Sequence, residues 1–153
     1  MENKSFVGMR GVLIEGSKVL LIRRVRDDNI YYVFPGGHIS LGETHEECVV
    51  REMEEELSIK TNPINLIYTC TQNDETQGYY LMNRLEGPPQ KTENADYQRG
   101  INNTMEPIWV SLDKLDALEG RGIVPLIIKN QLIIDINSKV DFTKSKTVDL
   151  FDE

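Results

Sequence analysis

The sequence predicts an α/β (α+β) sandwich with a mixed β-sheet, and three observations favour this class. Strand-like runs lie before, between and after two or three helical segments. Two runs near the N-terminus are joined by a short turn signal, which is typical of an antiparallel hairpin. A strand–helix–strand order follows, and such a crossover connects parallel strands. Because the chain has 153 residues, 39% of them hydrophobic, we expect one folded domain over residues 1–153, with its core at about 6–134.

The first strands are predicted from β-rich runs and the turns between them. The runs "FVGMRGVLIEG" and "KVLLIRRV" flank the turn signal "EGSK" and should form the hairpin. The run "IYYVF" predicts a short aromatic strand that ends at Pro35-Gly36-Gly37, because proline and glycine interrupt strands. A loop should then continue to Gly42.

A helix is predicted over about residues 43–58. Thr44 is a favourable N-cap, and Glu47 three positions later completes a capping box. One apolar stripe recurs at every fourth position: Val49, Met53 and Leu57. This stripe should pack on a sheet, and the helix should end near Ser58, before Pro63.

The second half of the chain predicts three more strands and a second helix. The strands are "INLIYTCTQ", "GYYLMNRLE" and "MEPIWVSL", and a long polar stretch over 87–104 separates the last two. A short helix should begin at Ser111, and "VPLIIKNQLIIDI" predicts the second helix with Pro125 in its first turn. The polar tail over 138–153 is expected to be loosely held.

Composition argues against several classes of function. The net charge of −8 disfavours polymeric nucleic acid as a partner, because an acidic surface repels its phosphates. A small anionic ligand remains compatible with this charge when cations mediate the contact. No apolar run approaches the ~18 residues that span a bilayer, and the N-terminus lacks the apolar stretch of a signal peptide. Cys48 and Cys70 are too few for a disulfide framework. We therefore expect a cytoplasmic protein with no membrane partner.

Three glutamates in the predicted helix indicate a metal site. Glu52, Glu55 and Glu56 stand at positions i, i+3 and i+4 and share one helix face. They should project over the turn that contains Gly36 and Gly37, where glycine leaves backbone carbonyls accessible. Carboxylates plus a carbonyl form a hard oxygen site that suits Mg²⁺ or Mn²⁺.

Arg51 is the cation within reach of these carboxylates. Its planar fork can hold one glutamate in a fixed rotamer while the others bind metal. The alternative is an ordinary surface pair between Arg51 and Glu55, which contributes well under ~1 kcal/mol. Spacing alone leaves both interpretations open.

The whole segment resembles the signature of the Nudix family. Gly37 is followed after five residues by Glu43, and after seven more by "REMEEELSI". At that place the family has Arg-Glu-apolar, any residue, Glu-Glu, any residue, Gly and an apolar residue. Ser58 replaces the family's glycine, which serves as a left-handed helix cap and carries no chemistry. The runs "YYVFPGG" and "WVSLDKL" extend the resemblance.

The resemblance implies the α/β/α sandwich of the Nudix fold and a hydrolase that uses a divalent metal. Such enzymes cleave the pyrophosphate bond of a nucleoside diphosphate linked to another group, so the partner should be a small nucleotide-type substrate. ADP-sugars, nucleoside triphosphates, dinucleoside polyphosphates and cap-like molecules all remain open. A homodimer is implied by analogy, because many members pair in this way.

The resemblance also assigns roles around the metal. It implies that Glu55 and Glu56 are the main ligands of Mg²⁺ or Mn²⁺ and that the Gly36 carbonyl completes the coordination. Arg51 should orient the glutamates, and Glu43 should hold the loop against the helix.

The general base stays open between two places. Glu52 is either a further metal ligand or the group that activates the attacking water. In many members the base comes from a later loop, where Glu93 and Asp96 are the candidates. The alternative for these two is an ordinary solvated loop charge.

Four residues are candidates for contact with the substrate: Arg23, Gly37, Tyr32 and Glu93. Arg23 is preferred to Arg24 for a phosphate contact, since strand alternation sends only one of them to the cleft. Tyr32 can stack on a base, although aromatic residues in strands are more often part of the core.

Two rival hypotheses accompany the hydrolase. A catalytically silent Nudix-fold module would bind or sense a nucleotide, but such a module has no need for the complete set of Arg51, Glu52, Glu55 and Glu56. An acidic protein with no site, whose charges only aid solubility, predicts no effect of metal on stability.

Overall fold

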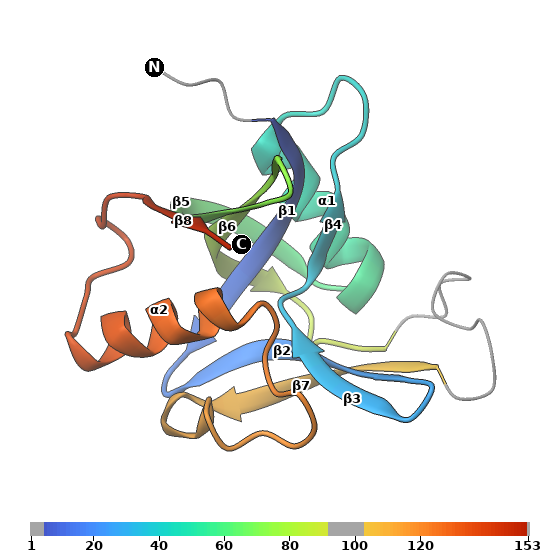
Figure 1. The fold of residues 1–153 in the computed structure, drawn as a ribbon. Helices are drawn as coiled ribbons and strands as arrows, with labels where there is room; N and C mark the ends of the chain where they lie inside the picture. The colour runs from blue at the N-terminus through green and yellow to red at the C-terminus, as the bar shows by residue number, and fades with distance from the viewer. Residues whose placement is uncertain (1–4, 92–102, 153) are drawn as a thin grey trace.

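The computed structural model describes residues 5–91 and 103–152 (Figure 1). Within these ranges, eight strands form one mixed sheet with the path β3-β2-β1-β6-β5-β8, and β4 pairs with β1 and β7 with β2. The strands are β1 (Phe6–Glu15), β2 (Lys18–Arg26), β3 (Asn29–Val33), β4 (Gly36–His38), β5 (Lys60–Gln72), β6 (Glu75–Glu86), β7 (Thr104–Ser111) and β8 (Val148–Phe151). The helices are α1 (His45–Leu57), α2 (Leu126–Asn137) and the short 3₁₀ helix η2 (Leu112–Lys114). The predicted mixed α/β architecture is confirmed.

Both predicted kinds of strand pairing are present. β1 and β2 form the antiparallel hairpin, with Ile14 opposite Val19. β1 pairs in parallel with β6, and β5 pairs in parallel with β8. Since α1 lies between β4 and β5 in the chain, it forms part of the crossover that parallel pairing requires.

The start and end of α1 follow from local chemistry. The hydroxyl of Thr44 accepts a hydrogen bond from the backbone N–H of Glu47 at 3.0 Å, and the N–H of Thr44 donates to Oε1 of Glu47 at 2.9 Å. The predicted capping box is therefore confirmed. Ser58 ends the helix in the left-handed region, with φ of 59°, where a side chain is strained.

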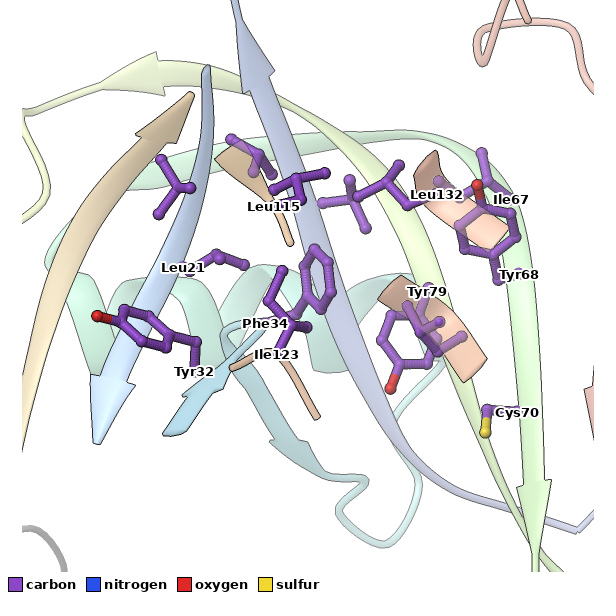
Figure 2. Close-up of a cluster of buried hydrophobic side chains, with 14 residues drawn as sticks. Leu21, Tyr32, Phe34, Ile67, Tyr68, Cys70, Tyr79, Leu115, Ile123 and Leu132 are labelled. Carbon is purple, nitrogen blue, oxygen red and sulfur yellow. The ribbon is translucent and has the colours of Figure 1, made fainter. Parts of the chain in front are cut away.

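The two helices cover opposite faces of the sheet. Met9 and Leu13 of β1 pack in the same cluster as the buried residues of α1, whereas Val12 of β1 packs with Ile128 and Leu132 of α2. This alternation follows from the two-residue period of a strand. Figure 1 shows α1 in teal and α2 in orange with strands between them, and Figure 2 shows the cluster on the α2 face.

The prediction that the glycine pair lies in a turn and loop is wrong, because it belongs to β4. Gly36 and Gly37 pair antiparallel with Arg10 and Met9 of β1. A Cβ on Gly8 would lie 2.6 Å from the carbonyl oxygen of Gly37, so the absence of a side chain allows this close approach. The glycines are thus held by the sheet.

The prediction of a loosely held tail is also wrong. After α2 the chain returns to β5, where Nδ2 of Asn65 donates to the carbonyls of Phe142 and Ser145 at 2.8 Å each. Oγ1 of Thr69 donates to Oδ1 of Asp149 at 2.6 Å. The tail reaches β5 through these hydrogen bonds and through the parallel pairing of β8, and a polar sequence does not reveal such partners.

Several boundaries differ from the expected ones. β5 begins at Lys60 and contains Pro63, which is tolerated because the pairing is irregular between Pro63 and Asn65. The short helix after β7 is the 3₁₀ helix η2, and α2 begins at Leu126, directly after Pro125. In the part of the chain that the structure describes, no helix is long and apolar enough to cross a membrane.

The strained cap of α1 leads to a prediction about stability. Ser58→Gly should raise the free energy of unfolding by about 1 kcal/mol, because glycine adopts a positive φ without strain. Ser138→Gly is the matched control, since Ser138 ends α2 with φ of −86° and glycine there only adds entropy to the unfolded chain. Denaturant titration of both variants checks this; equal destabilisation of the two would contradict it.

Candidate functional site

Arg51 gathers three glutamates and a backbone carbonyl where α1 meets β4. Its Nε and Nη2 contact the two carboxylate oxygens of Glu43 at 2.6 and 3.0 Å, which is a bidentate pair. Its Nη1 contacts Oε1 of Glu52 at 2.9 Å and Oε2 of Glu55 at 3.1 Å. Nη2 also donates to the carbonyl of His38 at 3.0 Å. The interpretation of Arg51 as a simple surface pair with Glu55 is therefore wrong.

Carboxylates of α1 lie directly against the backbone of β4. The N–H of Gly36 donates to Oε1 of Glu56 at 3.0 Å. A Cβ on Gly37 would lie 2.6 Å from the carboxylate carbon of Glu52. Glycine at position 37 therefore leaves the space that this carboxylate occupies.

The ion pair between Glu43 and Arg51 shifts the pKa values of both residues. The hydrogen bonds from Arg51 and from the N–H of Ser40 lower the pKa of Glu43 to about 2. Glu43 in turn raises the pKa of Arg51. Burial raises the pKa of the Cys48 thiol to about 11, and its Sγ lies 3.8 Å from the carbonyl oxygen of Gly37. Glu43 and Arg51 thus stay charged and Cys48 stays neutral at physiological pH.

The side chains at this junction suit a hard divalent cation, because their donors are carboxylate oxygens beside the backbone of β4. Across residues 5–91 and 103–152, no group of three or more His, Cys, Asp or Glu side chains is already arranged around one point. Glu52 and Glu55 both contact Nη1 of Arg51, while Glu56 contacts Gly36. The glutamates are therefore gathered by protein hydrogen bonds.

A cavity of about 670 Å³ lies on the α2 face of the sheet, next to β4. Its lining includes two arginines, aromatic side chains and polar groups: Arg10, Phe34, His38, Gln77, Tyr79 and Arg121. β4 lies between this cavity and α1. His38 shows this most directly, because it lines the cavity while its carbonyl accepts from Arg51.

Two aromatic rings form a wall of the cavity. Phe34 and Tyr79 pack edge to face with their ring centroids 5.7 Å apart, and Ile123 belongs to the same cluster (Figure 2). Burial raises the pKa of Tyr79, so its hydroxyl stays protonated. Both rings are almost fully buried, so they form the packed base of the cavity and fix its shape.

Arg23 and Tyr32, two of the predicted substrate contacts, hold a loop in place. The hydroxyl of Tyr32 donates to Oε1 of Glu119 at 3.0 Å, and Nε of Arg23 contacts the same oxygen at 2.6 Å. The ring of Tyr32 is buried in the core. The loop then runs beside β3, where Tyr32 exchanges backbone hydrogen bonds with Gly122 and Val124 at 2.9 Å each. Neither Arg23 nor Tyr32 lines the cavity.

The remaining predicted site residues are Gly37, Glu93 and Asp96. Gly37 lies at the junction of β4 and α1, as described above. Glu93 and Asp96 lie outside the described residues. Arg10 and Arg121 line the cavity but did not emerge from the sequence. An arginine inside the otherwise apolar run "FVGMRGVLIEG" is the signal that could have drawn notice to Arg10.

Comparison with known proteins found relatives of one family. The model of the NUDIX domain family matches residues 6–127. An 8-oxo-dGTP diphosphatase of Escherichia coli K12 is 35% identical over 67% of this chain and 77% of its own length. An NAD-capped RNA hydrolase of Photobacterium profundum is 26% identical over 76% of this chain, and an ADP-ribose pyrophosphatase of Methanocaldococcus jannaschii is 34% identical over 44%. The matches span only 41% and 42% of the lengths of these last two.

Solved structures share the fold. A NUDIX hydrolase from Nitrosomonas europaea superposes with a TM-score of 0.70 and 14% identity, over 99% of this chain and 81% of that chain. An ADP-ribose pyrophosphatase from Streptococcus suis 89-1591 has a TM-score of 0.66 and 18% identity, over 98% of this chain and 100% of that chain. At these identities the likeness establishes the fold.

The Glu43–Arg51 pair leads to a prediction about pH. Because folding lowers the pKa of Glu43 from 4.5 to about 2, the pair stabilises the protein fully above pH 4.5 and loses this effect as the pH falls toward 2. Glu43→Gln should therefore cost on the order of 1 kcal/mol of unfolding free energy at pH 6. The difference from the parent should shrink steadily below pH 4.5. Denaturant titrations across pH, with Glu54→Gln as an exposed control on α1, test this; a difference independent of pH would contradict it.

Proposed function

Because the chain belongs to the Nudix hydrolase family, we propose that it cleaves the pyrophosphate bond of a nucleoside diphosphate linked to another group and requires a divalent cation. The observation that carries the proposal is the cluster of α1 glutamates gathered by Arg51 against the glycines of β4. A cavity on the other side of β4 from this cluster provides room for the nucleoside.

The diphosphate is assigned to the junction of α1 and β4. A site with so many carboxylates repels a pyrophosphate unless cations lie between them. We assign Mg²⁺ or Mn²⁺ to Glu52, Glu55 and Glu56 together with the carbonyl of Gly36. When bound, such a cation polarises a phosphoryl oxygen and lowers the pKa of water.

The protein's own groups supply position and charge. Arg51 orients the carboxylates of Glu52 and Glu55 through Nη1, and Glu43 fixes the guanidinium plane through two hydrogen bonds. Outer partners of this kind set the direction of metal ligands. Either Glu52 or one of Glu93 and Asp96 accepts the proton of the attacking water.

The substrate is assigned only by class. The three relatives are named for three different substrates, 8-oxo-dGTP, NAD-capped RNA and ADP-ribose. What these names share is a nucleoside next to a phosphoanhydride, and the proposal adopts that common part. We also propose a cytoplasmic location, supported by two free thiols at Cys48 and Cys70, and a homodimer by analogy with family members.

Glu56→Gln tests the proposed role of the glutamates. In a screen of nucleoside diphosphate derivatives with and without Mg²⁺, the parent should release product from at least one compound only when Mg²⁺ is present. Glu56→Gln should lower kcat by about 100-fold or more, because an amide cannot replace the negative charge. Glu54→Gln, at an exposed position of the same helix, is the control.

Two results would count against the proposal. Full activity of Glu56→Gln would remove this residue from the metal site. Tight nucleotide binding with no turnover of any compound would favour the silent binding module instead.

Arg51→Ala tests the orienting role of the guanidinium. We expect a loss of about 10- to 100-fold in activity and weaker binding of Mn²⁺, because Glu52 and Glu55 lose their common donor. Arg51→Lys keeps the charge but cannot contact both oxygens of Glu43 in one plane, so it should recover little activity. Steady-state kinetics and metal titration of both variants measure this. If Arg51→Ala has wild-type kinetics, Arg51 has no orienting role and is only a surface charge.

A further inference from the structure

Arg10 is a half-buried cation in the wall of the cavity that the site at α1 does not use. We propose that Arg10 selects the nucleobase of the substrate, favouring a 6-oxopurine such as guanine or hypoxanthine over adenine. This inference rests on the proposed function, because it assumes that the cavity receives the nucleoside.

The guanidinium of Arg10 is held in one orientation. Its Nε donates to Oε1 of Gln77 at 2.9 Å, and its Nη1 donates to the carbonyl of Phe34 at 2.9 Å. Two contacts on a planar group fix the plane. In the part of the chain that the structure describes, Nη2 has no hydrogen-bond partner. Arginine has no acceptor, so whatever meets Nη2 in the cavity must present one.

The charge of Arg10 is available to a ligand. Glu75 and Asp152 line the same cavity, but neither forms an ion pair with Arg10 among residues 5–91 and 103–152. Gly36 lies opposite Arg10 in the β1–β4 pairing, and a Cβ there would lie 3.0 Å from Cδ of Arg10. Glycine at this position therefore also makes room for the arginine side chain.

The position of Arg10 favours a base over a phosphate as its ligand. Strand alternation sends Met9 to the α1 face and Arg10 to the opposite face of the sheet. The phosphates are assigned to the α1 side of β4, so Arg10 faces the part of the substrate that lies beyond them. There its Nη1 is held by the carbonyl of Phe34, at the packed base of the cavity.

Hydrogen-bond chemistry then chooses among the bases. Among the described residues, one hydrogen of Nη1 and those of Nη2 remain unused, so the Nη1–Nη2 edge of the guanidinium can donate to two neighbouring acceptors, and O6 and N7 of a 6-oxopurine provide them. Adenine presents an amino donor in place of O6, and a donor cannot pair with a guanidinium. If Arg10 contacts the base in this cavity, adenine should therefore bind more weakly than a 6-oxopurine.

Calorimetry with IDP and ADP tests the inference directly, because the two differ in the purine ring at C6 and its adjacent N1 proton and share ribose and diphosphate. With Mg²⁺ present, the parent should bind IDP roughly 5- to 100-fold more tightly than ADP. Arg10→Met and Arg10→Lys should both bring the ratio close to one, since lysine keeps the charge but lacks the planar fork. Thermal unfolding of each variant confirms that the fold is retained.

Arg121→Met is the matched control. Arg121 lines the same cavity, but its guanidinium lies over the ring of Tyr31, 5.9 Å from the centroid. Its loss should weaken both ligands by a similar factor and leave their ratio unchanged.

Two kinds of result would overturn the inference. Equal binding of IDP and ADP by the parent, or binding of neither, removes base selection. An equal loss for both ligands in Arg10→Met makes Arg10 a phosphate contact. If the protein prefers IDP but hydrolyses no compound, the inference stands and the proposed function is rejected. If it hydrolyses a substrate but shows no base preference, the proposed function stands and the inference is rejected.

Discussion

The bidentate pair between Arg51 and Glu43 is the contact on which the site depends. It joins the middle of α1 to the segment that precedes the helix, and the same guanidinium then reaches Glu52, Glu55 and the carbonyl of His38. Without a cation at its centre, a helix face with this many carboxylates would repel itself. Arg51 therefore both relieves the repulsion and sets the direction in which the acids point. A single side chain thus links the stability of the helix to the geometry of the proposed chemistry.

The three residues of β4 separate two surfaces, one that faces α1 and one that faces the cavity around Arg10. Its glycines allow the acids of α1 to lie on one side and the side chain of Arg10 to lie on the other. A larger residue at position 37 would collide with Glu52, and one at position 36 would collide with Arg10 and the backbone of β1. The glycine pair therefore places the proposed phosphate and nucleoside regions next to each other.

Much of α1 and its cluster of charged residues could be predicted from sequence, because their contacts join residues that are close together in the chain. The capping box of Thr44 and Glu47, the stripe of α1 and the spacing of Arg51 from Glu43 all lie within nine consecutive residues or fewer, so their spacing is visible in the chain. The contacts that were missed join distant segments. β4 became a strand because β1 offered a partner, the tail was held by β5, and Arg23 met Glu119 from 96 residues away. Amino-acid composition does not reveal contacts between distant segments, and the cavity around Arg10 forms only when those segments pack together.

The thiol of Cys48 has a practical use. It is fully buried under β4, with Sγ 3.8 Å from the carbonyl of Gly37, and its pKa of about 11 leaves almost no reactive thiolate at neutral pH. An alkylating reagent can reach it only when α1 lifts away from β4. The rate of labelling at Cys48 would therefore report how often the junction opens, and its slowing by a ligand would measure how firmly that ligand clamps helix and strand together.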